Sequence, residues 1–235
     1  RNARADQVAR SGRRTRIKRM ENVAAITFDV GGTLIEPWPS VGHVYSAVAA
    51  RHGVRAEPEE LTHRFVDAWN RKENFNYSQD DWAGMVDATF AGLTTTLPSQ
   101  SFFDELYLRF AEPDCWHVYE DVIPTLTALR ERGVRLAVIS NWDVRLRPLL
   151  QALNLADWFE VIHVSSELGS TKPDRRIFQA AIDSFGLSAA QILHVGDSEI
   201  EDHRGAKAAG MQSRWLCRDC NEPLTHTINS LLSFT

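Results

Sequence analysis

Runs of consecutive apolar residues alternate along the chain with segments in which apolar residues recur every three or four positions. Five of these runs predict buried strands, because strands covered on both faces are almost continuously apolar. They are Val23–Phe28, Val134–Ile139, Phe159–Val164, Gln191–Val195 and Ser213–Cys217. Helices that end before a glycine, a common helix terminator, are predicted over Ile123–Arg132, Asp174–Phe185 and Asp202–Ala209. This β-α-β alternation predicts an α/β fold with a doubly wound parallel sheet.

Residues 38–113 depart from this alternation and contain no predicted strand. Amphipathic helices are predicted there, over Val41–His52, Pro58–Glu73, Asp80–Leu93 and Ser101–Phe110. We therefore expect an α/β core domain, formed by residues 21–37 and 114–235, with an inserted helical cap domain formed by residues 38–113. An insert placed directly after the first strand is a candidate lid over a site at the sheet edge.

Composition excludes several classes of protein. The chain has 235 residues, of which 43% are hydrophobic and 24% charged, as in ordinary globular proteins. Its apolar runs are too short to cross a membrane. The three cysteines do not indicate a secreted disulfide framework. We expect a cytoplasmic protein, a monomer or a homodimer, that binds neither membranes nor nucleic acid.

The first 19 residues are unusually basic, with eight Arg or Lys residues and one acid, whereas the whole chain has a net charge of −5. We interpret residues 1–20 as a disordered basic arm upstream of a natural start at Met20. A transit peptide, or an arm that contacts nucleic acid or an acidic partner, is the alternative.

Candidate chemical groups follow four of the predicted strands, where ligands bind in an open parallel sheet. These groups are Asp29, Gly31 and Gly32, then Ser140 and Asn141, then Lys172, and finally Asp197 and Asp202. Clustered carboxylates require a cation, and oxygen ligands suit Mg²⁺. A carboxylate can attack phosphorus, and hydroxyl, amide and ammonium groups can stabilise phosphoryl oxygens. Glycines let the backbone approach a ligand closely.

Four motifs resemble those of the haloacid dehalogenase superfamily: FDVGGTL, VISN, TKPD and HVGDSEIED, in that order. The resemblance covers residues 23–37 and 114–217, and the insert is similar in position to the superfamily's type-one cap. It implies a Rossmann-like fold and a Mg²⁺-dependent phosphatase acting on a small phosphorylated metabolite. Its implied roles are Asp29 as nucleophile, Ser140 and Lys172 as phosphoryl-binding groups, and Gly31, Gly32 and Asn141 as substrate-binding residues. The implied metal ligands are Asp29, the Gly31 carbonyl, Asp197 and Asp202.

One position departs from the phosphatase pattern, because Gly31 stands where most family phosphatases have a second aspartate that acts as general acid and base. Such a group commonly contributes 10²–10⁴-fold to the rate. Good leaving groups, or replacement by Glu36, His43 or Tyr45, would compensate. The alternatives are a 2-haloacid dehalogenase, a catalytically impaired binding protein, and the phosphonate-cleaving branch. That branch needs a cap lysine, whereas Lys72 is expected at a solvated helix end.

Several remaining residues have a structural interpretation and a functional one. Trp38 and Trp142 lie beside motifs and are candidates to line a hydrophobic pocket for an aromatic substrate, whereas Trp69 and Trp82 are expected in the core. His194 is expected to be a packed core residue, and Glu199 and Glu201 to be solvated. The CxxC spacing of Cys217 and Cys220 supplies two of the four ligands of a structural zinc site, so a metal or redox role is not favoured.

Overall fold

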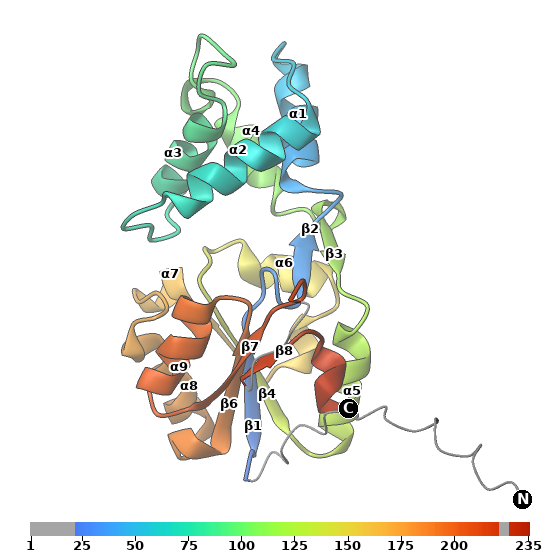
Figure 1. Cartoon of the computed structure of the whole chain (residues 1–235), viewed down its shortest axis with the longest axis vertical. Helices are drawn as coiled ribbons and strands as arrows, with labels where there is room; N and C mark the ends of the chain where they lie inside the picture. The colour runs from blue at the N-terminus through green and yellow to red at the C-terminus, as the bar shows by residue number, and fades with distance from the viewer. Residues whose placement is uncertain (1–21, 221–225) are drawn as a thin grey trace, which may run out of the picture.

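The computed structural model describes residues 22–220 and 226–235, so the basic arm expected at residues 1–20 lies outside the described residues. Six strands form one parallel sheet in the order β5-β4-β1-β6-β7-β8 (Figure 1). Their bounds are β1 Ala25–Phe28, β4 Arg135–Ser140, β5 Val161–Val164, β6 Ile192–Gly196, β7 Gln212–Leu216 and β8 Thr227–Ile228. The predicted parallel α/β fold is confirmed.

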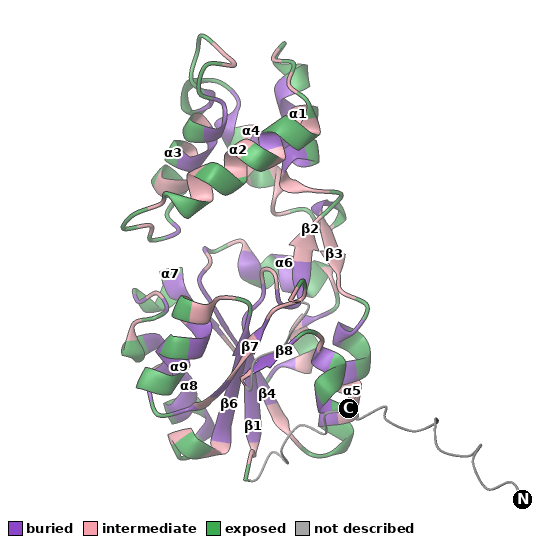
Figure 2. Cartoon of the chain, in the orientation of Figure 1, coloured by how far each residue is buried: buried purple, intermediate pink, exposed green. Residues whose placement is uncertain are grey.

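Helices cover both faces of this sheet (Figure 2), and the side chains of β1, β4 and β6 alternate between the two core clusters. Ile26 and Phe28 of β1 pack with α5 and α6, whereas Ala25 packs with α8 and α9. The helix bounds are α5 Val122–Glu131, α6 Leu146–Ala152, α7 Ser165–Leu168, α8 Arg175–Phe185 and α9 Gly205–Ala208. Burial on both faces explains why the central strands are continuously apolar.

A separate helical lobe stands over the carboxyl edge of the sheet (Figure 1). It consists of α1 Val41–Arg51, α2 Pro58–Asn70, α3 Gln79–Thr89 and α4 Phe103–Arg109. Ser40 and Ser78 cap α1 and α3 by accepting backbone hydrogen bonds, as serine does at helix N-termini. This lobe has its own core of buried side chains, which includes Tyr45, Leu61 and Phe90.

Two short strands link the lobes, and the sequence analysis did not predict them. β2, Ile35–Pro37, pairs antiparallel with β3, Trp116–Val118, so that the chain entering the helical lobe lies beside the chain leaving it. Strands of three residues are too short for a hydrophobic period to be recognised. The strand β8 and the helices α6 and α7 were also not predicted.

One predicted helix differs in kind from the structure. The segment expected as a helix over Asp202–Ala209 begins earlier, as a π-helix over Glu199–Arg204, and continues into α9. Single π-turns within helices are often found at functional sites. Short 3₁₀ turns occur at Pro98–Gln100, Pro113–Cys115, Ala156–Trp158, Ala189–Gln191 and Leu231–Phe234. Within residues 22–220 and 226–235, no helix combines the length and apolar character needed to cross a membrane.

A polar network centred on Asp121, at the start of α5, connects the end of the sheet to the loop after β1. The Asp121 carboxylate accepts hydrogen bonds from both Arg218 Nη atoms (3.0 and 3.1 Å), from the Ser230 hydroxyl (2.8 Å) and from the Leu231 amide (2.9 Å). Arg218 Nη2 also donates to the Thr33 carbonyl at 2.6 Å. Cys217 and Cys220, which flank Arg218, form a disulfide that the sequence analysis did not predict.

We expect Asp121→Asn to lower the free energy of unfolding by about 1–3 kcal/mol at neutral pH, because it removes a largely buried charge from several donors. Partial burial alone would raise the pKa of Asp121, but hydrogen bonds from Arg218, Ser230 and the Leu231 amide hold this pKa below its usual range. The stabilisation is therefore present above about pH 4, the unfolded pKa, and is lost as pH falls through the folded pKa.

Urea midpoints of the wild type and Asp121→Asn, measured at pH 6 and at pH 3, test this expectation. The difference between the two proteins should shrink at the lower pH. Asp80→Asn, at an exposed position, is the matched control and should show no comparable change. A difference for Asp121→Asn that is equal at both pH values would contradict the ionic origin of the stabilisation.

Candidate active site

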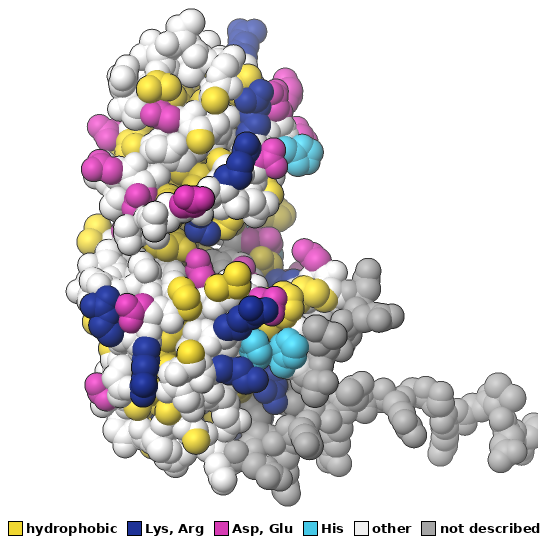
Figure 3. Space-filling view, turned by 60° about the vertical axis from the view of Figure 1, so that its left-hand side comes forward, with side chains coloured by type: hydrophobic (Ala, Val, Ile, Leu, Met, Phe, Trp, Pro, Cys, Tyr) yellow, Lys and Arg dark blue, Asp and Glu magenta, His cyan; other side chains and the backbone are white. Residues whose placement is uncertain are grey.

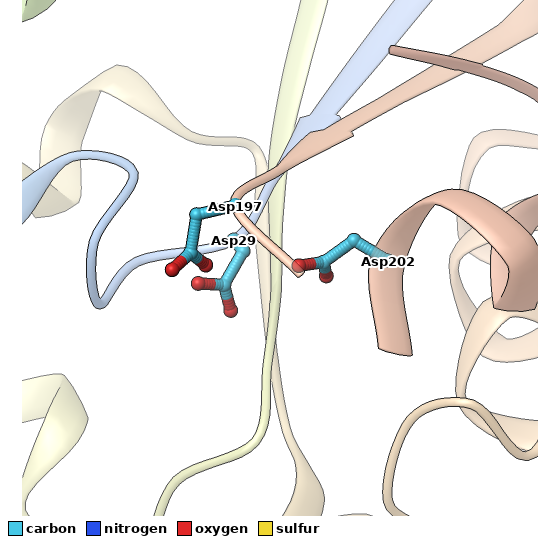
Figure 4. Close-up of side chains that lie close together, drawn as sticks. All are labelled: Asp29, Asp197 and Asp202. Carbon is cyan, nitrogen blue, oxygen red and sulfur yellow. The ribbon is translucent and has the colours of Figure 1, made fainter. Parts of the chain in front are cut away.

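The site lies at the carboxyl end of β1, where the connections leave toward opposite sides of the sheet. β1 is hydrogen-bonded to β4 on one side and to β6 on the other, so its end is the topological switch point of the fold. Asp29 directly follows β1, Asp197 directly follows β6, and Asp202 lies in the π-helix after it (Figure 4). One oxygen from each of these three carboxylates lies within 4.8 Å of the other two.

Lys172 connects two of the three carboxylates. Its Nζ donates to Asp29 Oδ1 and to Asp202 Oδ1, both at 2.6 Å, and to the Ile139 carbonyl at 3.0 Å. The Lys172 side chain is 1% exposed, so these charge-assisted bonds replace its hydration. Burial alone would lower the pKa of Lys172, but the two carboxylates raise this pKa above its usual range, and the side chain stays charged.

Ser140 and Asn141, at the end of β4, position Asp29 and Lys172. The Ser140 hydroxyl donates to Asp29 Oδ1 at 2.9 Å. Asn141 accepts a hydrogen bond from the Lys172 amide at 2.7 Å and donates from Nδ2 to the Lys172 carbonyl at 3.0 Å. The Asn141 side chain therefore holds the backbone of Lys172 on both sides of its Cα, a role that the sequence analysis did not anticipate.

Asp202 also contacts His194, which lies in β6 and is fully buried, as expected of a packed core residue. His194 Nε2 lies 2.9 Å from Asp202 Oδ1, and its Nδ1 lies 2.8 Å from the Thr27 hydroxyl. Burial alone would raise the pKa of Asp202, but the Lys172 ammonium and the bond from His194 hold it well below its usual range. Asp202 is therefore ionised, and His194 orients it.

Asp197 has a different environment, because it is exposed at the cleft. Restricted hydration and the negative charges of Asp29 and Asp202 raise the pKa of Asp197 well above its usual range. Burial likewise raises the pKa of Asp29, although Lys172 opposes this effect. Burial is the largest cause of both shifts, and the neighbouring carboxylates add to it, as expected of clustered negative charge without a further cation.

The charge balance of the trio of carboxylates, Asp29, Asp197 and Asp202, fits a divalent cation. Among the described residues, Lys172 is the one ammonium that forms ion pairs with the trio, so three carboxylates are matched by one positive charge. Two negative charges remain, on hard oxygen donors that suit Mg²⁺. Asp29, Asp197 and Asp202 are therefore the side chains that would hold the ion, and Gly31 borders the same cavity.

A cavity of about 350 Å³ extends from these carboxylates into the helical lobe. Glu201 and Lys72 both line this cavity and form an ion pair in it, with 3.9 Å between Glu201 Oε1 and Lys72 Nζ. Glu201 also accepts hydrogen bonds from Asn141 Nδ2 at 3.1 Å and from the Tyr77 hydroxyl at 3.4 Å. The expectations that Glu201 is solvated and that Lys72 lies at a solvated helix end are therefore wrong. The turn after α2 brings Lys72 over the Trp69 ring, 3.8 Å from its centroid.

The aromatic residues of the cavity also differ from those expected. Trp142 lines it as expected. Trp69 and Trp82, which were expected in the core, line it too, and Trp82 also packs against the core of the helical lobe. Trp38 is 52% exposed, packs against the His117 ring, and is not among the described lining residues. Of the proposed substitutes for a second aspartate, Tyr45 lines the cavity, whereas Glu36 pairs with His117 and His43 bonds to Ser40. Adjacency to a motif in sequence was therefore right for Trp142 and wrong for Trp38.

Comparison with known proteins identifies relatives of the chain. A family model described as haloacid dehalogenase-like hydrolase matches residues 23–210. The chain is 37% identical over 199 residues to the haloacid dehalogenase-like hydrolase domain-containing protein 3 of Mus musculus, covering 80% of this chain and 79% of that protein.

Solved structures share the fold with this chain. A predicted phosphoglycolate phosphatase from Haemophilus somnus is 27% identical, with a TM-score of 0.67, over 84% of this chain and 86% of its own. The HAD-hydrolase YfnB of Bacillus subtilis, solved with magnesium bound, is 18% identical, with a TM-score of 0.73, over 90% of this chain and 96% of its own. The L-2-haloacid dehalogenase of Xanthobacter autotrophicus also has the fold, at 20% identity and a TM-score of 0.66, over 89% of this chain and 95% of its own. The shared fold thus includes both phosphatases and dehalogenases.

Gly32 offers a test of the metal site, because its backbone has a φ of +72° and a Cβ added there would lie 2.3 Å from Asp197 Oδ2. We expect Gly32→Ala to displace the Asp197 carboxylate and to weaken Mg²⁺ binding about 10- to 100-fold, the usual loss when the groups that position a metal ligand are disturbed. Isothermal titration calorimetry with MgCl₂ measures this change.

Gly53→Ala is the matched control, since Gly53 has a φ of +78° and open space around it. Both substitutions should lower the free energy of unfolding by about 1–2 kcal/mol through the left-handed backbone alone. Mg²⁺ affinities that are equal in the two variants would show that Asp197 is not a ligand.

Proposed function

The chain belongs to the haloacid dehalogenase-like hydrolase family, and we propose that it is a Mg²⁺-dependent phosphatase in which Asp29 attacks a small phosphate monoester. The observation that carries the proposal is the trio of Asp29, Asp197 and Asp202, with which one ammonium, that of Lys172, forms ion pairs among residues 22–220 and 226–235. Displacement of halide by an aspartate needs no cation, whereas transfer of a dianionic phosphoryl group to a carboxylate does. We also propose residues 38–113 as a cap domain that covers the bound ester.

The hydrogen bonds of Asp29 distinguish its two carboxylate oxygens. Oδ1 accepts from both Ser140 and Lys172, which holds the carboxylate in one orientation. We therefore assign the attack to Oδ2. A bond forms between Oδ2 and phosphorus while the bond from phosphorus to the ester oxygen breaks, and the leaving group takes that electron pair. Water then attacks the phosphorus of the phospho-aspartate, releasing phosphate and restoring the Asp29 carboxylate.

Residues around Asp29 stabilise the transferring phosphoryl group. Lys172 and Ser140 already lie within hydrogen-bond distance of the nucleophile and are placed to donate to phosphoryl oxygens. Asn141 maintains this placement through the Lys172 backbone. Gly31 and Gly32 border the cavity without side chains, which leaves room for the phosphoryl group. When bound, Mg²⁺ supplies Lewis-acid stabilisation of the negative charge on phosphoryl oxygens.

One prediction from this mechanism concerns the nucleophile. The wild type should hydrolyse p-nitrophenyl phosphate with Mg²⁺ and lose this activity in EDTA, and Asp29→Asn should lower kcat at least about 10³-fold because the attacking carboxylate is gone. Release of p-nitrophenolate is followed by absorbance. Asp183→Asn, on the exposed surface of α8, is the control and should keep wild-type activity.

Three results would count against the proposed phosphatase. Turnover that is equal in the wild type and in Asp29→Asn would exclude the proposed nucleophile. Release of chloride from 2-chloropropionate, unaffected by EDTA and abolished in Asp29→Asn, would support the dehalogenase alternative. A protein that binds Mg²⁺ but transforms neither compound would be a catalytically impaired binding protein.

Another prediction concerns the general acid and base that Gly31 cannot supply. A Cβ added at Gly31 would lie 3.3 Å from Trp142 Cζ3, so a side chain fits if the indole moves by a few tenths of an ångström. We expect Gly31→Asp to raise kcat for esters with poor leaving groups, such as glycerol 2-phosphate, about 10-fold or more. Hydrolysis of p-nitrophenyl phosphate should change much less, because its leaving group needs no proton.

Gly31→Asn is the matched variant for this prediction, since it adds a side chain of similar size that cannot transfer a proton at neutral pH. Inorganic phosphate released from each ester is measured for both variants. Equal activity of Gly31→Asp and Gly31→Asn toward glycerol 2-phosphate would mean that the absence of a carboxyl group at position 31 does not limit hydrolysis of this ester.

A further inference from the structure

The cavity changes character between its two ends. At its lower end it is lined by Asp29, Ser140, Lys172 and Asp197, and it then continues between the lobes into the helical lobe. Figure 3 shows the waist where the two lobes meet, with hydrophobic side chains beside acidic and basic ones. A phosphate ester bound with its phosphorus at Asp29 would therefore extend its leaving group into the helical lobe.

The helical end of the cavity is lined by stacked aromatic rings. The ring of Trp69 stacks on Phe65 (centroids 5.9 Å apart, planes 23° apart) and on Trp82 (5.9 Å, 20°). Tyr45 and Phe110 line the same space. Trp69 and Trp82 are partly exposed, and such rings favour offset or edge-to-face contact with another aromatic ring. A cavity of about 350 Å³ also has room for a ring attached to a phosphate.

The cationic side chains of this end are already paired. Arg145 donates from Nε and Nη2 to Asp143 at 2.8 and 2.6 Å, and from Nη1 to the Tyr107 carbonyl at 2.6 Å. Lys72 pairs with Glu201 and lies over the Trp69 ring. An anionic leaving group would have to break one of these pairs, and the Lys72 ammonium already occupies the face of the Trp69 ring that a cationic group would seek. The helical end therefore suits an uncharged group.

We propose that the substrate is a phosphate monoester whose leaving group carries an uncharged aromatic ring, held between the Trp69 and Trp82 side of the helical lobe and Trp142 of the α/β lobe. This inference rests on the proposed phosphatase function and adds its substrate class. It adds a binding role for Trp69 and Trp82 to the packing role that their helical spacing indicated.

The test compares benzyl phosphate with ethyl phosphate, because both release an alcohol and differ mainly in the aromatic ring. Burial of the ring should raise kcat/KM for benzyl phosphate about 10- to 100-fold over ethyl phosphate. Trp69→Leu should reduce this ratio several-fold, and Trp69→Phe, which retains a ring, should restore part of it. Trp158→Leu, on the α/β lobe away from the cavity, should leave the ratio unchanged.

The outcomes separate this inference from the proposed function. Equal kcat/KM for the two esters, or a preference for 2-phosphoglycolate, whose leaving group carries a carboxylate, would overturn the aromatic substrate class while leaving the phosphatase intact. If neither ester is hydrolysed, the affinities for benzylphosphonate and ethylphosphonate, measured by calorimetry, test the aromatic site independently of catalysis. Tighter binding of benzylphosphonate, lost in Trp69→Leu, would support the aromatic site without phosphatase activity, and equal binding would overturn it.

Discussion

The contact on which the rest of the site depends is the buried ammonium of Lys172 between Asp29 and Asp202. A lysine buried to this extent would lose its charge without such partners, and two carboxylates this close would repel each other without it. The structure surrounds the contact with positioning groups: Asn141 holds the Lys172 backbone, Ser140 orients Asp29, and His194 orients Asp202. The site is therefore pre-organised by interactions among residues of four separate segments.

The parts of the fold that the sequence predicted are those with a strong local signal. Continuous apolar runs such as Val134–Ile139 identify buried strands, and glycines after helices such as Asp174–Phe185 identify their ends. The arrangement of Asp29, Ser140, Lys172, Asp197 and Asp202 along one edge followed from the parallel sheet, because the carboxyl ends of such strands meet. The strands β2 and β3 lack a local signal and depend on their mutual pairing.

What the sequence could not predict depends on contacts between distant segments. Lys72 is charged and follows a helix, which usually means solvent exposure, yet its place is decided by Glu201 and Trp69. Two tryptophans show the same limit. The helical spacing of Trp69 indicated a core residue, but its side chain lines the cavity, whereas Trp38 lies beside a motif but is exposed outside the cavity. Whether an amphipathic face covers a core or a cavity is a property of the packed lobes, and one sequence does not contain a local marker for it.

The β2–β3 ladder has a consequence for motion. Both chain crossings between the lobes are joined side by side through the pairs Ile35–Val118, Glu36–His117 and Pro37–Trp116. Two independent flexible tethers would let the helical lobe tumble in many directions, and each approach to the sheet would then incur a large loss of configurational entropy. A single two-stranded ribbon restricts the lobe to bending and twisting about one axis. Any approach of the two lobes would thereby be confined to a narrow arc, along which the tryptophans of one lobe stay opposite the carboxylates of the other.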